Sequence, residues 1–356
     1  MKAQLAPGYY LREAGAIAQL GGLLTDYGHR RALIISGALS YQAAQAALEA
    51  TLREHGIVWS VCRYRGECSD EDAARIAEEA SPMWDMVVGV GGGKVLDLSK
   101  LVASLLNLPL TTIPTLISNC AATTPNVVVY HPDGTAKASR VSLVPPLWTL
   151  VDETVLQRSP APYFGSGLGD TLAKPYEALV GATSGSLLER AALTMAGLAA
   201  DGVRMQGKDA LRALAQGRSH PYLGSLTDAV LLAGSLVGGI GGDILRGAVA
   251  HALHDALTML PEANAALHGE KVAYGLMVQE VLLQRLPEDI QALRHVLLGL
   301  ELPVTWSTLT RSPTLPTTSI LDALAQRTLQ SPLLVNRLPE VDVQQLVDAI
   351  RFTEAL

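Results

Sequence analysis

The C-terminal half of the chain carries one carboxylate and three imidazoles in a pattern typical of metal sites. Asp170 follows Gly-Leu-Gly, His251 and His254 lie three residues apart in a segment with helical spacing, and His268 precedes Gly-Glu-Lys. Such ligands suit zinc, ferrous iron or a similar divalent ion, and they leave one coordination position for a substrate. A single Asp or His more often caps a helix or lies on its surface, so spacing alone leaves both interpretations open. The sequence has no HExxH motif, which excludes a zincin protease.

A glycine-rich turn in the first half could bind a nucleotide. Gly89 to Lys94 (Gly-Val-Gly-Gly-Gly-Lys) connects a β-branched run to a helical pattern. The backbone amides of such a turn, together with a helix N-terminus, can hold a pyrophosphate. It is not a Walker A loop, because Val88 stands where the first glycine is needed and Val95 replaces the Ser or Thr, and it lacks the full GxGxxG spacing. Ordinary turn geometry is the commoner reason for such glycines, so the surrounding elements must decide.

The elements around that turn predict an α/β domain over residues 1–155. Short apolar runs alternate there with segments in which Ala and Leu recur at helical spacing. Ser69 followed by Asp72 predicts a helix N-terminus, and His131 to Gly134 predicts a turn. The expected strands are Ala32–Ser36, Val58–Cys62, Met86–Val90, Leu110–Ile113 and Val127–Tyr130, and the expected helices are Tyr41–His55, Glu71–Ala80 and Lys94–Leu106.

The remaining residues, 156–356, predict an all-α domain. The helical candidates are Leu187–Ala200, Ser225–Val237 and Asp243–Leu260, and the segments Gly217–Gly224 and Thr305–Thr318 are expected to be loops. The fold class is therefore a Rossmann-like α/β nucleotide-binding domain followed by a helical metal-binding domain. We expect the active site in the cleft between them.

Composition narrows the function classes further. The 356 residues have a formal net charge of −7, which offers no broad basic surface to nucleic acid or anionic lipid. Three irregularly spaced cysteines do not make a disulfide framework and favour a reducing compartment. The most apolar stretch, Ala229–Ile240, is interrupted by glycine and shorter than a membrane span. These features predict a cytoplasmic protein with neither nucleic-acid nor membrane partners.

Several motifs in the same order resemble the iron-containing alcohol dehydrogenase superfamily, in its glycerol dehydrogenase-like branch, over nearly the whole chain. The matching segments are Val88–Lys94 with Asp97, Ile113–Thr115 with Ser118, Gly167–Asp170, His251–His254 and His268–Gly275. The resemblance implies a dehydroquinate synthase-like fold, an NAD(P)(H) cofactor, a small-molecule substrate and a homo-oligomer. It also implies one divalent ion, zinc or iron, bound by Asp170, His251 and His268.

The same resemblance assigns roles to other residues. It places His254 near the nicotinamide or the substrate, where an imidazole could relay a proton from the alcohol to solvent. Asn119 and Cys120 are expected at the substrate. The residues expected to bind the cofactor are Ser36, Gly92, Gly93, Lys94, Asp97, Thr115, Ser118, Thr124, Asn126 and Tyr130.

One departure from the family pattern concerns the substrate. Cys120 stands where glycerol dehydrogenases carry an Asp that contacts the polyol, and the neighbouring segments look more like a bacterial hydroxycarboxylate dehydrogenase subgroup that reduces 2-oxo acids. Lys174, one helical turn after Asp170, and Arg246, just before His251, could each receive a substrate carboxylate. Lys174 could equally form an i,i+4 ion pair, and Arg246 could be a solvated helix residue.

Cofactor choice depends on the end of the first predicted strand. An acidic residue there normally accepts the ribose 2′-hydroxyl and repels a 2′-phosphate, and Ser36-Gly37 supplies no acid. NADPH is therefore permitted, although sequence alone does not place Arg30, Arg31 or Arg63 near that phosphate. Metal identity also stays open among zinc, iron, nickel and manganese.

The sequence thus predicts a metal-dependent oxidoreductase for a 2-hydroxy acid and 2-oxo acid pair. The alternatives are a glycerol or other polyol dehydrogenase, a glycerol-1-phosphate dehydrogenase and a dehydroquinate synthase-like cyclase. A nucleotide- or metal-binding protein without catalysis is a further alternative. Asp170 in place of Glu at the first ligand, and the lack of a Lys/Arg-rich phosphate pocket around it, argue against the cyclase.

Overall fold

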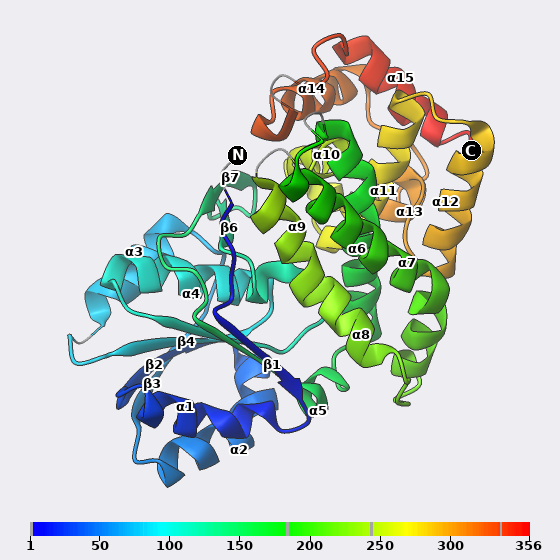
Figure 1. Cartoon of the computed structure of the whole chain (residues 1–356). Coiled ribbons are helices and arrows are strands. Elements are labelled where there is room, and N and C mark those ends of the chain that lie inside the picture. Colours follow the sequence, from blue (N-terminus) through cyan, green and yellow to red (C-terminus); the bar gives the residue numbers. More distant parts are fainter. Residues whose placement is uncertain (1–2, 81, 183–184, 243–244, 335–336) are drawn as a thin grey trace.

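The first half of the chain folds around a six-stranded parallel sheet, seen in the computed structural model of the protein (Figure 1). The structure describes residues 3–80, 82–182, 185–242, 245–334 and 337–356. The strand order is β1-β8-β5-β4-β2-β3, and every pair in this sheet is parallel. The strands are β1 (Tyr9–Glu13), β2 (Arg31–Ser36), β3 (Val58–Arg63), β4 (Met86–Gly91), β5 (Leu110–Pro114) and β8 (Trp148–Asp152).

Helices cover both faces of this sheet, which buries its central strands β4 and β5 along their whole length. Ile34 of β2 faces one core with α1 and α2, whereas the next residue, Ile35, faces the other core with α3 and α4. Figure 1 shows these two helix pairs on opposite sides of the sheet. The helices are η1 (Ala16–Gln19), α1 (Leu20–Asp26), α2 (Ala38–Glu54), α3 (Asp70–Glu79) and α4 (Gly93–Leu106), with η2 (Cys120–Ala122) after β5.

The predicted strands and helices of this half agree with the structure to within three residues at each end. Ser69 accepts a hydrogen bond from the Asp72 amide at 3.1 Å, as the capping pattern predicts. A second sheet pairs β6 (Asn126–Tyr130) with β7 (Ala136–Val141), and the predicted turn connects them, with Gly134 donating to the His131 carbonyl. Sequence analysis missed β1, β7 and β8. Strands β1 and β7 expose part of their surface and lack a continuous apolar run, whereas β8 is buried but short, with Thr149 and Asp152 among its apolar residues.

The second half is helical throughout the described residues, as predicted. Its longer helices are α6 (Ala161–Gly181), α7 (Leu187–Ala215), α9 (Gly234–Gly241), α10 (Val249–Leu257), α11 (His268–Leu282), α12 (Pro287–Gly299), α14 (Thr318–Leu329) and α15 (Val343–Thr353). The shorter ones are α5 (Glu153–Leu156), α8 (Leu223–Asp228), the π-helix η3 (Ala229–Ala233), η5 (Pro261–Ala263), α13 (Trp306–Thr310) and η6 (Pro332–Leu334).

Three details of the helical half differ from expectation. The segment Thr305–Thr318 contains α13, whose start is capped by the Thr305 side chain, so it is not all loop. The loop Gly217–Gly224 ends two residues early, where α8 begins at Leu223. The helix predicted from Asp243 begins only at Val249; Asp243 itself lies outside the described residues.

The apolar stretch around Ala229 is longer than the sequence suggested. Helical residues run without a break from Leu223 to Gly241, so its glycines do not interrupt it. By length and composition this 19-residue run could span a membrane, and 56% of its most apolar window is buried inside the protein. It packs against α7 and contributes Leu226, Val230 and Leu231 to the core. Packing within the fold therefore accounts for part of its apolar character.

Gly269, next to a predicted metal ligand, lies where α11 packs tightly against α6. A Cβ atom at this position would lie 1.8 Å from the Ser166 carbonyl oxygen. We expect Gly269→Ala to lower the free energy of unfolding by about 3 kcal/mol, the upper end of the usual cost of overpacking. Gly197→Ala on α7, where a Cβ meets nothing within 4 Å, should instead be neutral or stabilising by up to ~1 kcal/mol. Denaturant unfolding measures both, and equal stability of the two variants would contradict the prediction.

Candidate active site

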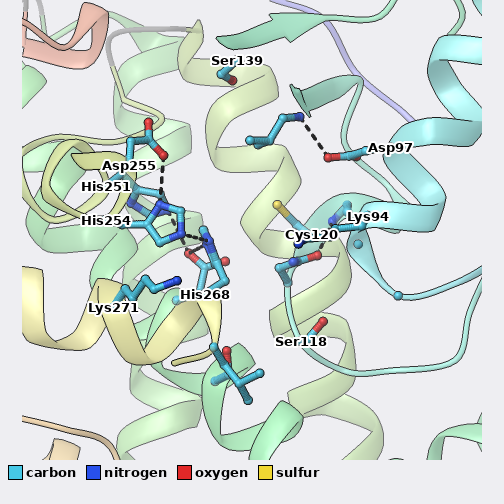
Figure 2. A pocket seen from close by; sticks show the side chains of 18 of the residues that line it. Lys94, Asp97, Ser118, Cys120, Ser139, His251, His254, Asp255, His268 and Lys271 are labelled. Atoms are coloured by element: carbon cyan, nitrogen blue, oxygen red, sulfur yellow. Dashed lines mark hydrogen bonds and ion pairs between the residues drawn. The ribbon is translucent and has the colours of Figure 1, made fainter. Parts of the chain in front are cut away.

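A cavity of about 720 Å³ lies between the carboxyl edge of the sheet and the helical half. The start of α4, the segment after β5, and β6 line one side, whereas α6, α9, α10 and α11 line the other. Figure 2 shows His251, His254 and His268 opposite Lys94, Asp97 and Ser118. All predicted site residues except Ser36 and Thr115 line this cavity. Ligand sites at the carboxyl ends of parallel strands are the general rule in α/β folds.

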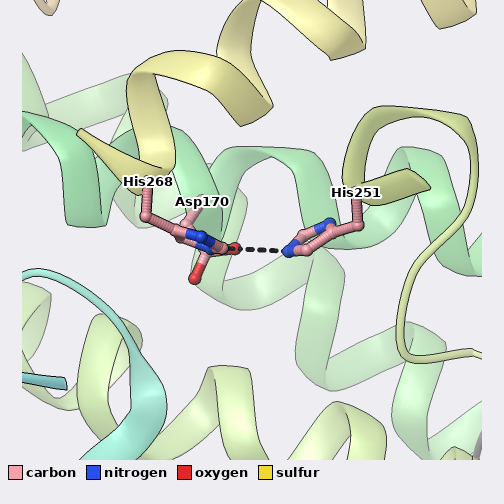
Figure 3. Close-up of side chains that lie close together, drawn as sticks. All are labelled: Asp170, His251 and His268. Carbon is pink, nitrogen blue, oxygen red and sulfur yellow. Dashed lines mark ion pairs between the residues drawn. The ribbon is translucent and has the colours of Figure 1, made fainter. Parts of the chain in front are cut away.

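Asp170, His251 and His268 come together from three helices at one wall of the cavity (Figure 3). One ligand atom from each lies within 4.8 Å of the others. Oδ1 of Asp170 is 3.2 Å from Nε2 of His251 and 3.8 Å from Nε2 of His268. A carboxylate oxygen and two imidazole nitrogens facing one point make a donor set for a divalent ion with an open coordination position.

Neighbouring carboxylates and imidazoles hold both rings with Nε2 toward this point. Glu177, fully buried on α6, accepts from Nδ1 of His251 at 2.6 Å, which leaves Nε2 facing Asp170. Nδ1 of His254 lies 2.9 Å from Asp255, and Nε2 of His254 lies 3.0 Å from Nδ1 of His268. A carboxylate such as Asp255 can only accept, so Nδ1 of His254 is its donor and Nε2 of His254 accepts from Nδ1 of His268. The Nε2 lone pair of His268 is therefore free. The residues present therefore fit a bound divalent ion.

Sequence analysis did not identify Glu177 or Asp255. Glu177 lies seven residues after Asp170, two turns along the same face of α6, and this spacing was the available signal. Asp255 adjoins His254 in sequence, but its role depends on how α10 meets α11. Both ring nitrogens of His254 contact other residues, so the proton relay predicted for it would have to pass through Asp255, whose side chain is 37% exposed.

The electrostatics of this cluster set a different protonation state for each member. Burial lowers the pKa of His251, but Glu177 and Asp170 outweigh it and raise that pKa to about 9, so an incoming ion would have to displace a proton from this ring. Burial and the nearby His268 lower the pKa of His254 to about 4, so the ring is neutral at pH 7 and can accept a hydrogen bond. Burial alone would raise the pKa of Asp170, but the ammonium group of Lys174 and the two imidazoles outweigh it and hold that pKa well below its usual range. Asp170 is therefore an anion despite being only 3% exposed.

Lys174 and Arg246 both reach the cavity. Nζ of Lys174 lies 2.6 Å from Oδ1 of Asp170, which is the i,i+4 ion pair considered from the sequence. Arg246 is half-buried and its guanidinium donates to the side chain of Asn126, so it is not a solvated helix residue. Cys120 lines the cavity as well, and burial raises the pKa of its thiol to about 11, which keeps it neutral.

The glycine-rich turn has no room for side chains at two of its positions. Gly92 is the N-cap of α4, and Cβ atoms added at Gly92 and Gly93 would lie 2.9 Å from Leu116 and 2.8 Å from Asn119. The turn thus presents bare backbone amides at a helix N-terminus. The Lys94 ammonium lies 2.5 Å from Glu67.

Asp97 and Tyr130 are held by other residues. Both carboxylate oxygens of Asp97 have partners, Lys100 at 2.7 Å and the Val128 amide at 3.0 Å, so this buried pair connects α4 to β6. The Lys94 ammonium lies 5.0 Å above the Tyr130 ring.

The structure keeps Ser36 and Thr115 behind the cavity wall. Ser36 is fully buried and donates to the Val90 carbonyl at 2.7 Å, and the Thr115 amide donates to the Gly91 carbonyl at 3.1 Å. Arg63 pairs with Ser36 in the parallel register of β2 and β3. Its guanidinium lies 4.3 Å above the Tyr41 ring and donates to the Gly37 carbonyl at 3.4 Å, which brings an exposed cation to the turn after β2.

The chain is similar to known dehydrogenases in sequence and in structure. Residues 7–153 match the family described as iron-containing alcohol dehydrogenase. Hydroxycarboxylate dehydrogenase A from Escherichia coli K12 is 34% identical over 282 residues, covering 78% of this chain and 77% of that protein. A glycerol dehydrogenase from Escherichia coli O6:H1 is 32% identical over 311 residues, covering 84% and 82%. The crystal structure of glycerol dehydrogenase from Schizosaccharomyces pombe superposes with a TM-score of 0.89 at 25% identity, covering 100% of this chain and 91% of that one.

Proposed function

This chain belongs to the iron-containing alcohol dehydrogenase family of metal-dependent alcohol and polyol oxidoreductases, and we propose that its substrate pair is a 2-hydroxy acid and the corresponding 2-oxo acid. The observation that carries the proposal is the pair of cations, Lys174 and Arg246, in the same cavity as the metal-binding cluster. A 2-oxo acid has a carboxylate next to its carbonyl, and each of these two cations could pair with that carboxylate. The neutral Cys120 thiol offers a polyol no charged acceptor.

In this proposal, different cavity residues have different roles in hydride transfer. Asp170, His251 and His268 would hold the metal, which when bound supplies Lewis-acid polarisation of the substrate oxygen. The amides of Gly92 and Gly93 would bind the pyrophosphate of the nicotinamide cofactor, and the cofactor when bound supplies hydride chemistry. His254 orients His268 by accepting from its Nδ1 while donating to Asp255, so a proton relay through His254 would first require the contact with His268 to open.

Lys174 and Arg246 orient the substrate through its carboxylate. Arg246 also touches Asn126 of β6, so carboxylate binding would connect the helical half to the nucleotide side.

Absorbance at 340 nm tests the substrate class. The purified protein is given NADH or NADPH and a panel of 2-oxo acids, aldehydes and dihydroxyacetone, with and without zinc or ferrous iron. We expect turnover of a 2-oxo acid, and we expect Arg246→Met to raise the KM for that acid at least ~10-fold while changing the KM for an uncharged aldehyde less than ~3-fold. Equal effects on both substrates would contradict carboxylate recognition by Arg246.

A polyol is the second candidate, because glycerol dehydrogenases are about as similar to the chain as the hydroxycarboxylate enzyme is. Reduction of dihydroxyacetone alone in the same assay would support it and overturn the 2-oxo acid proposal. Turnover of a phosphorylated substrate would indicate a glycerol-1-phosphate dehydrogenase. A reaction without net NAD(P)H change would indicate a cyclase.

We propose NADPH as the preferred cofactor. The turn Ser36 to Ser40 contains no acidic residue to repel a 2′-phosphate, and the Arg63 guanidinium lies against Gly37. We expect Arg63→Ala to raise the KM for NADPH roughly 10-fold, the value of about 1.4 kcal/mol for one charged contact. The KM for NADH should change less than about 2-fold. Steady-state kinetics with both cofactors distinguishes this result from equal losses, which would assign Arg63 a structural role.

The setting of the enzyme is also part of the proposal. We propose a cytoplasmic homo-oligomer, in keeping with three cysteines that are all free thiols. Subcellular fractionation and light scattering of the purified protein test the two statements separately.

A further inference from the structure

The ammonium group of Lys174 contacts two of the three metal-binding atoms directly. Its Nζ is 2.6 Å from Oδ1 of Asp170 and 3.4 Å from Nε2 of His251. These two atoms also face each other at 3.2 Å, and Oδ1 is the oxygen that faces His268. Lys174 is 6% exposed and Asp170 is 3% exposed, so neither charge has ready access to water. The lysine is thus the counter-ion of a buried carboxylate in the same place where a metal would be needed.

Two cations cannot both use this position. Zinc would lie about 2.0 to 2.2 Å from a carboxylate oxygen and an imidazole nitrogen. An ammonium within hydrogen-bond distance of the same atoms repels a divalent ion strongly, since buried charges are poorly screened. In the metal-free chain, however, the buried Asp170 needs a positive partner, because an unpaired buried carboxylate is costly. The lysine therefore stabilises the cluster without metal and opposes the ion that replaces it.

We propose that Lys174 is an internal cation that a divalent ion displaces on binding, and that its displacement frees the ammonium group to receive the substrate carboxylate. This inference rests on the proposed function for the identity of the carboxylate. It resolves a conflict in the geometry, since Lys174 paired with Asp170 has no ammonium to spare for a substrate. Lys174 lines the cavity, and its flexible four-carbon stem allows the group to turn into that space. Carboxylate recognition is thereby linked to metal loading.

The first test measures zinc binding by the metal-free protein, with a competing chelator as indicator. We expect Lys174→Met to bind zinc at least ~10-fold more tightly than the unchanged protein, because the competing cation is gone. The matched control is Lys271→Met, which removes another cavity lysine, 7% exposed, from the helix that carries His268. Its zinc affinity should change less than ~3-fold. Equal or weaker zinc binding by Lys174→Met would overturn the inference.

A second test uses the unchanged protein, so it does not depend on whether the variant folds. Reductive methylation of lysines is followed by peptide mass spectrometry with and without saturating zinc. We expect labelling of Lys174 to rise at least ~5-fold when zinc binds, relative to Lys271 in the same digest, because an ammonium group in an ion pair is a poor nucleophile. Unchanged labelling in zinc-loaded protein would overturn the inference while leaving the proposed function intact. Absence of zinc binding in the unchanged protein would instead contradict the proposed function.

Discussion

Replacing His268 with alanine is expected to abolish metal binding and lower turnover by at least ~10³-fold. His268 supplies one of three ligand atoms, and a site with Asp170 and His251 alone is too poor to retain the ion against chelators. Loss of the Lewis acid removes several kcal/mol of transition-state stabilisation, and ~10³-fold corresponds to about 4 kcal/mol. The affinity for NADPH should stay within about 3-fold, because the glycine-rich turn lies on the opposite wall of the cavity.

The measurement combines elemental analysis, steady-state kinetics and nucleotide binding by fluorescence. His295→Ala, an exposed histidine on α12, is the matched control and should change none of the three. Full activity of His268→Ala in metal-free buffer would exclude metal-assisted catalysis at this site. A large loss of nucleotide affinity would mean that His268 holds the fold of the cavity rather than an ion.

Several strands of the sheet domain could be predicted because the signal for each strand lies in its own residues. Strands β2 and β4 are buried on both faces, so each is a continuous apolar run that stands out from its surroundings. Strands β1 and β7 were not predicted because partial exposure removes that signal. Strand β8 was not predicted although it is buried, because Thr149 and Asp152 interrupt its apolar residues; it pairs with β1 and β5 in the sheet. The start of α10 could not be read either, since residues 245–248 carry helical spacing but do not form that helix.

The candidate site was likewise predictable from the sequence only in part. The motifs around Asp170, His251 and His268 identified the cluster, and the structure brings the three together from separate helices. Which ring nitrogen faces the centre depends on Glu177 and Asp255, and that is a property of tertiary packing. Proximity in sequence also cannot decide whether a lysine one turn after a carboxylate pairs with it, and here Lys174 does.

Glu177 is expected to control metal affinity although it does not touch the metal position. One of its oxygens accepts from the backbone amides of Ala248 and His251, at 2.7 and 3.0 Å, and the other accepts from Nδ1 of His251. In Glu177→Gln an oxygen can keep the amide bonds, but the NH₂ group then faces Nδ1. Two donors repel, so the neutral ring moves its proton to Nε2, the atom that must bind the ion.

We therefore expect Glu177→Gln to weaken zinc affinity roughly 10- to 100-fold, the usual cost of losing a carboxylate behind a ligating histidine. Turnover at saturating zinc should recover much further than in His268→Ala, because all three ligands are still present. Glu280→Gln is the matched control, a 4% exposed glutamate on α11 whose neighbours are Gln279 and Arg285. Zinc titration of the unchanged protein, Glu177→Gln and Glu280→Gln measures the effect. Unchanged zinc affinity in Glu177→Gln would show that the tautomer of His251 is set by something other than this carboxylate.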